Sequence, residues 1–357
     1  MNIGLIGLTQ TGKTTLFNLL TQAKAQAEKK ATNIGVAQVP DERIDFLSEL
    51  YSPKKTTYAQ IEFTDITGLA VSQDGHGSGS SRFLNDVRHC DALVHVLRGF
   101  DNQDVIHSME TINPARDLET IETELLFSDL ELVEKRIERI KESKKITAET
   151  QAELKKLEQC YDWMEQGKPM RDMVLTNEER ANMKNFAFLT EKPRLAVANL
   201  DEEQYKSQVY PFQRELISIC NGLNIPHLEL CAQMELEISE LSLEDRAIFM
   251  EDAGIKEPGI HVLAREVYSI LGLISFLTAG EDEVRAWTIN KGTIAREAAG
   301  KIHSDIERGF IRAEVVKFND VAELGRVAKV KEAGRFRLEG KEYIVEDGDV
   351  INFRFNV

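Results

Sequence analysis

Short apolar runs alternate with amphipathic segments over the first part of the chain. Ile3–Gly7 has the pattern of a buried strand, and Thr14–Gln22 that of a helix. Tyr58–Asp65 alternates apolar and polar residues, as a half-buried strand does, and Phe83–Cys90 is helical in pattern. Ala92–Phe100 is again an apolar run. Strands that alternate with helices predict a mostly parallel α/β sheet.

The pattern changes at about Asn113, and no strand signal follows until Phe186. Apolar residues recur there at alternating steps of three and four, which is typical of coiled-coil seams. The polar segment 143–150 separates two such seams and suits the tip of an antiparallel helical hairpin, with Thr147 or Thr150 capping the second arm. The seam residues are Leu126, Leu130, Val133, Ile137 and Ile140, followed by Leu154, Leu157, Tyr161 and Met164.

The α/β pattern resumes at residues 194–202 and 227–233, so the hairpin is an insertion in the first domain. From about Ser275, strand patterns surround one helical pattern at 294–306, which predicts a compact β-grasp domain of the ubiquitin-like type. The predicted domains are the first part of an α/β domain at 1–112, the helical insertion at 113–187, the second part of the α/β domain at 188–274 and the β-grasp domain at 275–357.

The 357 residues carry 44 basic and 60 acidic side chains, a formal net charge of −16. An acidic surface repels nucleic acids and anionic membranes, so we expect neither DNA nor a membrane as partner. The segment 134–145 has six basic and three acidic residues; it is either a local RNA contact or a solvated helix face. No apolar run approaches the ~18 residues of a membrane span, and the four scattered cysteines form no CxxC pair. These features indicate a cytoplasmic protein with reduced cysteines.

The segment Gly7–Thr14 fits the pattern G-x-x-x-x-G-K-[ST] between a strand and a helix. In such a P-loop, backbone N–H groups surround the α- and β-phosphates at a helix N-terminus. Lys13 is expected to reach the β- and γ-phosphates as a catalytic group, and the Thr14 hydroxyl to ligate Mg²⁺. The residues expected to hold the nucleotide here are Thr9, Gln10, Thr11, Gly12, Lys13, Thr14 and Thr15.

Asp65-Ile-Thr-Gly68 ends a predicted strand about fifty residues beyond the P-loop. Asp65 is expected to hold Mg²⁺ through water, and the Gly68 N–H to contact the γ-phosphate. Leu69 follows, at the position where many switch GTPases place the Gln that orients the attacking water. Because an aliphatic side chain cannot hydrogen-bond water, we expect slow hydrolysis unless residues 72–81 or a partner supply that contact.

Asn199-Leu-Asp-Glu202 follows a strand, where GTPases carry the base-reading N-K-x-D. Leu200 replaces the Lys and keeps an apolar packing surface for the base, while Glu202 is one methylene longer than the Asp that reads guanine. Cys231-Ala232-Gln233 stands where a GTPase carries S-A-K, and the Ala232 N–H can still meet the base. These changes weaken a guanine-specific reader, so ATP is expected to bind at least as well as GTP.

The order of these motifs, with "NIGVAQVPDERID", "IEFTDITGLA", "FLNDVRHCDALVHVLRGF" and "NLDEE", resembles the YchF family of Obg-related GTPases. The last eighty or so residues are similar to that family's TGS domain. The resemblance covers the whole chain. It implies a cytosolic P-loop NTPase of three parts that associates with ribosomes and ribosomal RNA and can use ATP.

The sequence departs from the family pattern in three places. Thr9-Gln10 replaces the usual Pro-Asn, whose Asn helps to hold potassium in related enzymes, so K⁺ dependence stays open. The first switch segment is short, and Thr32 is its one candidate for a Mg²⁺-sensing hydroxyl. Cys231-Ala232-Gln233 replaces S-A-K.

Two functions remain open. The first is a slow, Mg²⁺-dependent ATPase or GTPase that acts as a monomeric switch, and its hydrolysis changes a ribosome-binding surface. The second is a ribosome- or RNA-binding regulatory module in which nucleotide binding is structural and hydrolysis is incidental. A small-molecule P-loop kinase is disfavoured, because no second substrate pocket is indicated and a TGS domain would have no role.

Overall fold

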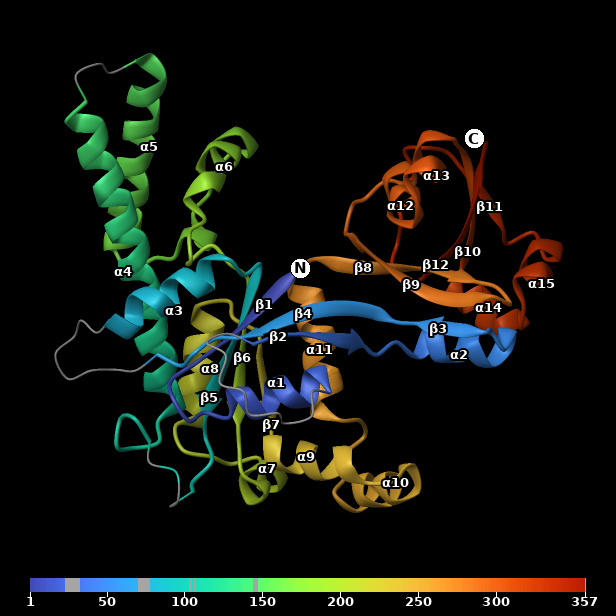
Figure 1. The fold of residues 1–357 in the computed structure, drawn as a ribbon, viewed down its shortest axis with the longest axis horizontal. Helices are drawn as coiled ribbons and strands as arrows, with labels where there is room; N and C mark the ends of the chain where they lie inside the picture. Colours follow the sequence, from blue (N-terminus) through green and yellow to red (C-terminus); the bar gives the residue numbers. More distant parts are fainter. Residues whose placement is uncertain (23–32, 70–77, 103–104, 106, 144–146, 357) are drawn as a thin grey trace. The chain divides into compact units, whose positions relative to one another are not determined.

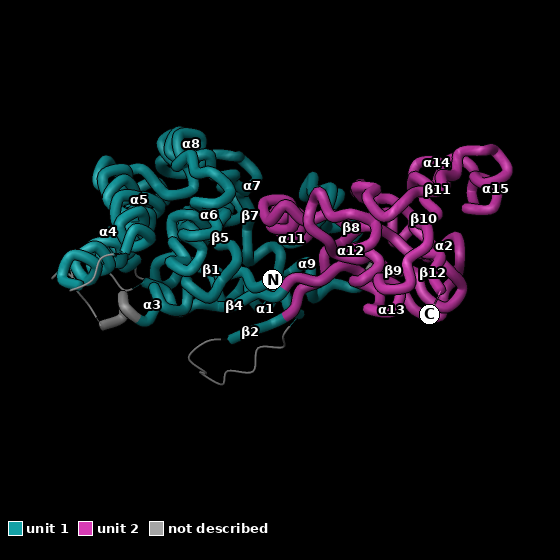
Figure 2. Tube along the Cα trace, turned by 90° about the horizontal axis from the view of Figure 1, so that it is seen from above, with its two compact units in different colours: residues 1–35, 62–260 teal, residues 36–61, 261–357 magenta. Residues whose placement is uncertain are grey.

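The computed structural model describes residues 1–22, 33–69, 78–102, 105, 107–143 and 147–356. Their contacts divide the chain into two compact units, coloured separately in Figure 2. Unit 1 comprises residues 1–35 and 62–260, and unit 2 comprises residues 36–61 and 261–357. None of the described helices has the length and apolar character that a membrane span requires.

Unit 1 is built on a six-stranded sheet with the order β2-β4-β1-β5-β6-β7, in which β1 lies between β4 and β5 (Figure 1). The pairs β1–β4, β1–β5, β5–β6 and β6–β7 are parallel, so the predicted α/β sheet is confirmed. Every residue of β5 is buried, as expected of a central strand covered on both faces. The strands are β1 (Asn2–Ile6), β2 (Asn33–Val39), β4 (Ala59–Asp65), β5 (Ala92–Arg98), β6 (Arg194–Asn199) and β7 (His227–Leu230).

Helices connect these strands. The four cysteines are buried and have free thiols; they are Cys90, Cys160, Cys220 and Cys231. The helices of unit 1 are α1 (Lys13–Thr21), α3 (Ser78–Arg88), α4 (Pro114–Lys141), α5 (Ala148–Glu165), α6 (Asn177–Met183), α7 (Glu202–Ser207), α8 (Gln213–Gly222), α9 (Ala232–Glu240) and α10 (Leu243–Asp252), with 3₁₀ turns at Met170–Asp172 and Lys184–Phe186. Helix α11 (Gly259–Ile270) follows and belongs mostly to unit 2.

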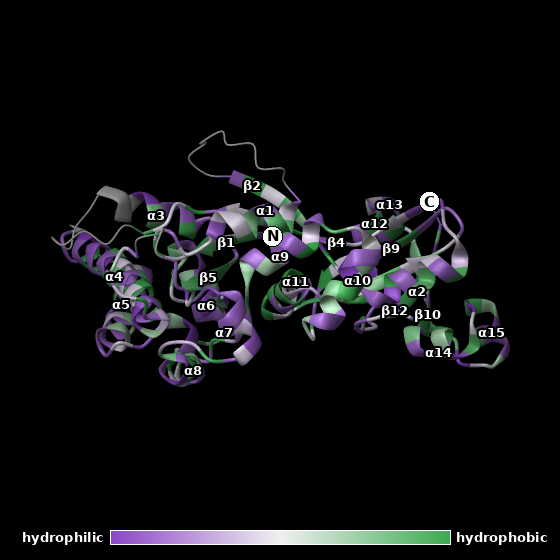
Figure 3. Ribbon diagram, turned by 90° about the horizontal axis from the view of Figure 1, so that it is seen from below, coloured by the Kyte–Doolittle hydropathy of each residue, from purple (hydrophilic) through white to green (hydrophobic). Residues whose placement is uncertain are grey.

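Helices α4 and α5 run antiparallel and pack along one seam (Figure 1). Asn113 caps α4 by accepting a hydrogen bond from the Arg116 N–H at 3.0 Å, and Pro114 occupies the first turn, where its missing donor has no cost. Thr147 and Thr150 form a capping box at the start of α5, so the predicted cap is confirmed. Figure 3 shows both hydrophobic and hydrophilic colours along the two helices, as amphipathic helices require.

A buried carboxylate fixes the base of this hairpin. Asp129 of α4 accepts hydrogen bonds from the N–H groups of Leu189 and Thr190, at 2.9 and 2.8 Å, and from the Thr190 hydroxyl at 2.8 Å. Arg88, at the end of α3, donates to the Ser128 hydroxyl at 2.9 Å and lies 3.9 Å from Asp129. The segment that leads back to β6 is therefore tied to both α3 and α4.

Unit 2 is a mixed six-stranded sheet with the order β11-β10-β12-β8-β9-β3. The pairs β8–β9, β10–β12 and β10–β11 are antiparallel, whereas β12–β8 and β3–β9 are parallel. Residues 36–61 group with this sheet, because Lys55–Thr57 pair with Glu283–Arg285. The strands are β3 (Lys55–Thr57), β8 (Leu273–Ala279), β9 (Glu283–Asn290), β10 (Phe310–Lys317), β11 (Arg337–Glu339) and β12 (Asp349–Phe355), and the helices are α2 (Glu42–Tyr51), α12 (Ala295–Ile302), α13 (Ser304–Arg308), α14 (Phe318–Leu324) and α15 (Val327–Glu332).

Candidate nucleotide-binding site

The loop between β1 and α1 is held in a conformation that its glycines make accessible. Gly7 and Gly12 have φ angles of 149° and 92°. A Cβ at Gly7 would lie 2.4 Å from the Val96 carbonyl oxygen, and one at Gly12 would lie 2.3 Å from Nδ2 of Asn199. Only glycine fits both positions, so the loop can pass close to its neighbours and turn its backbone N–H groups toward an anion.

Lys13 begins α1 and is 7% exposed. Its ammonium group donates to the Leu8 carbonyl oxygen and lies 3.5 Å from the Thr11 hydroxyl. Burial lowers the pKa of Lys13 to about 8, against an opposing contribution from the charge of Asp65. A cation held beside the loop in this way is suited to an anionic phosphate.

Thr14 and Asp65 meet at the ends of neighbouring elements. Leu5 of β1 is in register with Asp65 of β4, and the Thr14 hydroxyl donates to Oδ2 of Asp65 at 2.8 Å. Burial raises the pKa of Asp65, while the Thr14 hydrogen bond and the charge of Lys13 lower it. A hydroxyl and a carboxylate are the oxygen ligands that Mg²⁺ takes from proteins, with waters and substrate phosphates completing its shell. The residues present therefore fit a magnesium ion.

Gly68 and Leu69 lie against the same loop. A Cβ at Gly68 would lie 2.8 Å from the Lys13 ammonium and 3.0 Å from the Leu8 carbonyl oxygen, so a side chain at this position would crowd the lysine and the loop. The Leu69 N–H donates to the Gly7 carbonyl oxygen at 3.1 Å. The Leu69 side chain is only 3% exposed and packs in the core cluster that includes Ile6. It therefore fills the core and offers no polar group to a water molecule.

Asn199 joins the P-loop to the loops after β6 and β7. Its side-chain amide donates to the Thr11 carbonyl oxygen at 3.0 Å, and its side-chain oxygen accepts from the Ala232 N–H at 3.0 Å. The hydrogen-bond donor and the acceptor of this buried amide are thus both satisfied, each by a backbone group of a different loop.

Leu200 and Glu202 are the two residues expected at the base beside Asn199. Leu200 is 2% exposed and packs in the core with Tyr210, so the expectation that its side chain packs on the base is not met. Glu202 stands in the first turn of α7 and pairs with Lys206 at 2.6 Å. The reason is local: Asp201 caps α7 together with Gln204, and this box directs Glu202 onto the helix surface.

The loop after β7 leads directly into α9. Cys231 is 2% exposed and caps α9, with its sulfur accepting from the Met234 N–H at 3.5 Å. Ala232 presents its N–H to Asn199, and Gln233 is exposed, with its amide 3.1 Å from Glu237. Within the P-loop, Gln10 is exposed, and Thr9 and Thr15 are half-buried. Thr32 and residues 72–77 lie outside the described residues.

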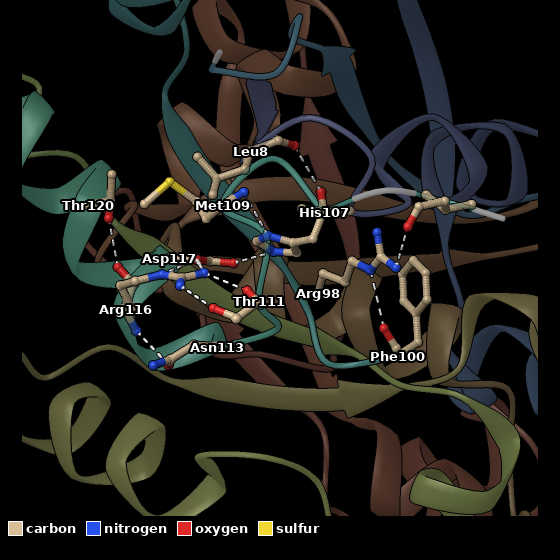
Figure 4. A network of polar contacts seen from close by, with 12 residues as sticks. Leu8, Arg98, Phe100, His107, Met109, Thr111, Asn113, Arg116, Asp117 and Thr120 are labelled. Carbon is tan, nitrogen blue, oxygen red and sulfur yellow. Dashed lines mark hydrogen bonds and ion pairs between the residues drawn. The ribbon is translucent and has the colours of Figure 1, made fainter. Parts of the chain in front are cut away.

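The loop after β5 is organised by side chains that no sequence motif had singled out. Arg98 is 1% exposed and donates to the carbonyl oxygens of Phe100, Asn102 and Val105, while its guanidinium lies 4.5 Å from the centroid of the Phe100 ring (Figure 4). The only sequence signal was an arginine at the end of an otherwise apolar strand.

Further along the loop, His107 and Asp117 are both buried and lie 2.9 Å apart (Figure 4). The Met109 N–H donates to the other ring nitrogen of His107 at 3.0 Å. The N–H groups of Gly99 and Phe100 donate to the Asn199 carbonyl oxygen, so this loop adjoins the loop expected to meet the base.

A glycine-framed loop after the first strand of a parallel sheet, with a buried lysine and a threonine–aspartate pair beside it, defines a P-loop nucleoside triphosphatase domain. Residues 2–128 match the family model described as a 50S ribosome-binding GTPase, and residues 273–356 match the model YchF-GTPase_C, described as a protein of unknown function. The chain belongs to the YchF family.

Similarity to individual relatives extends over the full length. The chain is 43% identical to the ribosome-binding ATPase YchF of Bacillus subtilis (strain 168), over all of both chains. It is 41% identical to the protein of the same name from Escherichia coli O157:H7, over 99% of each. The solved structure of the Schizosaccharomyces pombe YchF GTPase is 29% identical, with a TM-score of 0.87 over 99% of this chain and 97% of that one.

Proposed function

We propose that this protein is a Mg²⁺-dependent nucleoside triphosphatase that acts as a ribosome-associated switch and uses ATP at least as well as GTP. The observation that carries the proposal is the Thr14–Asp65 pair beside the buried Lys13, at the mouth of the P-loop. Thr14 would ligate Mg²⁺ directly, Asp65 would do so through water, and Thr32 is the candidate for a further hydroxyl. Bound Mg²⁺ would neutralise the charge of the transferred phosphate.

The base preference rests on the loops that Asn199 joins. Guanine-specific sites hydrogen-bond the N1–H and 2-amino group of the base with one carboxylate. Here Glu202 stands in place of that Asp, in an exposed ion pair with Lys206, and Leu200 is buried, so the guanine-specific contact is weakened. A site without such a reader discriminates between bases by shape alone, which gives about 10- to 200-fold at most. The Ala232 N–H and the Asn199 bridge serve either purine.

The domain division proposed from the sequence differs from the two contact-defined units at residues 36–61 and 261–274, which belong to unit 2. We propose that residues 1–112 and 188–274 form the P-loop domain, that residues 113–187 form an inserted coiled-coil hairpin, and that residues 275–357 form a TGS domain of the β-grasp type. The α4–α5 seam and the mixed sheet around α12 support this division.

Ribosome association is inferred from the relatives, whose names describe a ribosome-binding ATPase. We propose the tip of the hairpin and the TGS domain as contacts with ribosomal RNA, by a monomer in the cytoplasm. Lys141 at the tip pairs with Glu158 at 2.8 Å, and Lys144 and Lys145 lie outside the described residues. An exposed pair of this kind contributes at most about 1 kcal/mol, so Lys141 can exchange its partner for a phosphate.

Sedimentation through sucrose gradients with ribosomes tests this function. The protein should co-sediment, and the bound fraction should differ between ADP and a non-hydrolysable triphosphate. Replacing Lys141, Lys144 and Lys145 with Glu should reduce co-sedimentation, whereas the same change at exposed Lys184, Arg214 and Lys256 should not. Binding that is indifferent to the nucleotide, with a single-turnover rate unchanged by ribosomes, would favour the alternative of a regulatory module whose hydrolysis is incidental.

A further inference from the structure

A groove of about 650 Å³ runs along the hairpin, between α4 and the end of α5. Its floor is apolar and is formed by Leu126, Leu130, Tyr161, Met164 and Pro169. Four of these side chains also belong to the core of the hairpin, so the groove is a stretch of that core left open on one flank. Its volume lies within the range of about 300–1,000 Å³ that is usual for ligand sites.

One aromatic side chain stands at this opening. Phe127 lines the groove and is 60% exposed. Its neighbour Leu126 turns into the hairpin core, so the two residues present apolar surface on adjoining parts of α4. A large exposed aromatic beside an open apolar floor is the usual character of a surface that anchors a partner.

The rim of the groove is acidic. Glu131, Glu134 and Glu165 line it, and Glu131 pairs with Lys135 one turn along α4. Glu134 and Glu165 are exposed and form no ion pair within the part of the chain that the structure describes. Deeper in, Glu122 is already paired with Arg194. The two unpaired carboxylates therefore give the rim a negative charge that a partner can meet.

We infer that this groove binds a cationic, amphipathic segment of a partner protein, with its apolar side chains on the floor and its Lys or Arg side chains against Glu134 and Glu165. The groove follows α4 from Thr123 to Glu134, which at 1.5 Å per residue is about 16 Å. That length suits about three turns of helix or five residues of extended chain. This site goes beyond the proposed function, because it uses neither the nucleotide nor the basic tip of the hairpin.

The negative charge of the rim favours the binding of a basic protein segment over the binding of RNA. Phosphates would face Glu131, Glu134 and Glu165 across a short distance, which is unfavourable. A basic peptide meets the same carboxylates with opposite charge, and its apolar side chains cover Phe127 and the floor.

Fluorescence anisotropy with designed peptides of about 12 residues tests the inference. The probe has Lys and Arg on one helical face and Leu and Trp on the other. A second peptide keeps the basic residues and replaces the apolar ones with Ser, a third replaces the basic residues with Glu, and a single-stranded RNA of similar length is the nucleic-acid probe. The protein variants are Phe127→Ser and the pair Glu134→Lys with Glu165→Lys. The control pair is Glu142→Lys with Glu149→Lys, which makes the same charge change at exposed positions outside the groove.

The amphipathic basic peptide should bind best. Its affinity should fall by about tenfold or more in Phe127→Ser and in the groove pair, and by less than about threefold in the control pair. Three results would overturn the inference: equal binding of the basic peptide without apolar residues, equal losses in both charge pairs, or RNA that competes for the site. Melting curves of all variants establish that the losses are not caused by unfolding.

Discussion

The side-chain amide of Asn199 donates to the backbone carbonyl oxygen of Thr11 at 3.0 Å, across 188 positions of sequence. The same side chain accepts from the Ala232 N–H. Replacing Asn199 with Ala should leave two buried backbone groups unsatisfied, each at a cost of about 1–3 kcal/mol. We expect the affinity for ATP and for GTP to fall together, by about tenfold or more, in calorimetric titrations.

Asn199→Asp is the informative companion, because a carboxylate can accept from Ala232 but cannot donate to Thr11. Its ATP affinity should also fall, and by a similar factor for GTP. A variant that lost one nucleotide and kept the other would show that Asn199 reads the base instead of bracing the loops.

Because the His95 imidazole is buried, we expect the stability of the protein to decrease as the pH falls below 6.5. Burial, followed by the charges of Arg194 and Lys13, lowers the pKa of His95 from 6.5 to about 3, and neither ring nitrogen has a hydrogen-bond partner among the described residues. Between pH 6.5 and pH 3 the unfolded chain binds a proton at this position that the folded chain does not. The free energy of unfolding should therefore decrease by about 1.4 kcal/mol for each pH unit below 6.5 on account of His95 alone.

Urea denaturation of the wild type and of His95→Leu at pH 7, 6 and 5 measures this contribution. The variant should be at least as stable as the wild type at pH 7, and it should lose less stability on acidification. Parallel pH profiles for the two proteins would contradict the assignment of a buried, neutral imidazole.

Leu69 predicts slow hydrolysis in the absence of a partner. Its side chain is packed in the core and cannot orient water, so single-turnover hydrolysis of ATP should proceed below about 1 s⁻¹. Leu69→Ala should lower the melting temperature, because it opens a cavity in that core. Its nucleotide affinity should stay close to that of the wild type, whereas Lys13→Ala should lose binding. Turnover above about 1 s⁻¹ by the isolated protein would be incompatible with this account.

We expect the Asp129 carboxylate to anchor the hairpin to the segment at Leu189 and Thr190. Asp129→Ala removes the acceptor for three hydrogen bonds from Leu189 and Thr190, so the free energy of unfolding should drop by about 3 kcal/mol or more. Asp129→Asn keeps one carbonyl acceptor and should lie between the wild type and the alanine variant. Equal stability of all three proteins would mean that the backbone holds this junction without the carboxylate.

Much of unit 1 could be predicted because its signals are local. The apolar run of β5, the P-loop glycines and the capping box at Thr147 each follow from residues adjacent in sequence. Asn199 braces the P-loop from the end of β6, and its place after a predicted strand already put it at the same sheet edge.

The surroundings of the base were harder to predict, because they depend on packing between distant segments. Leu200 is buried by Tyr210, and Glu202 is turned outward by the cap that Asp201 forms with Gln204. The pairing of Lys55–Thr57 with β9 has no local signal either, since a three-residue edge strand is fixed by its partner.

Titration calorimetry of the wild-type protein with ATP and with GTP, each in the presence of Mg²⁺, tests the central claim most directly. The claim is that the guanine-specific reader of this P-loop site is weakened, because Glu202 stands in place of the usual Asp, in an exposed pair with Lys206, and Leu200 is buried. The account predicts a Kd for ATP equal to or lower than that for GTP. A clear preference for GTP would contradict it, and a preference above about 200-fold would require an intact guanine-specific reader, because shape alone gives no more than that.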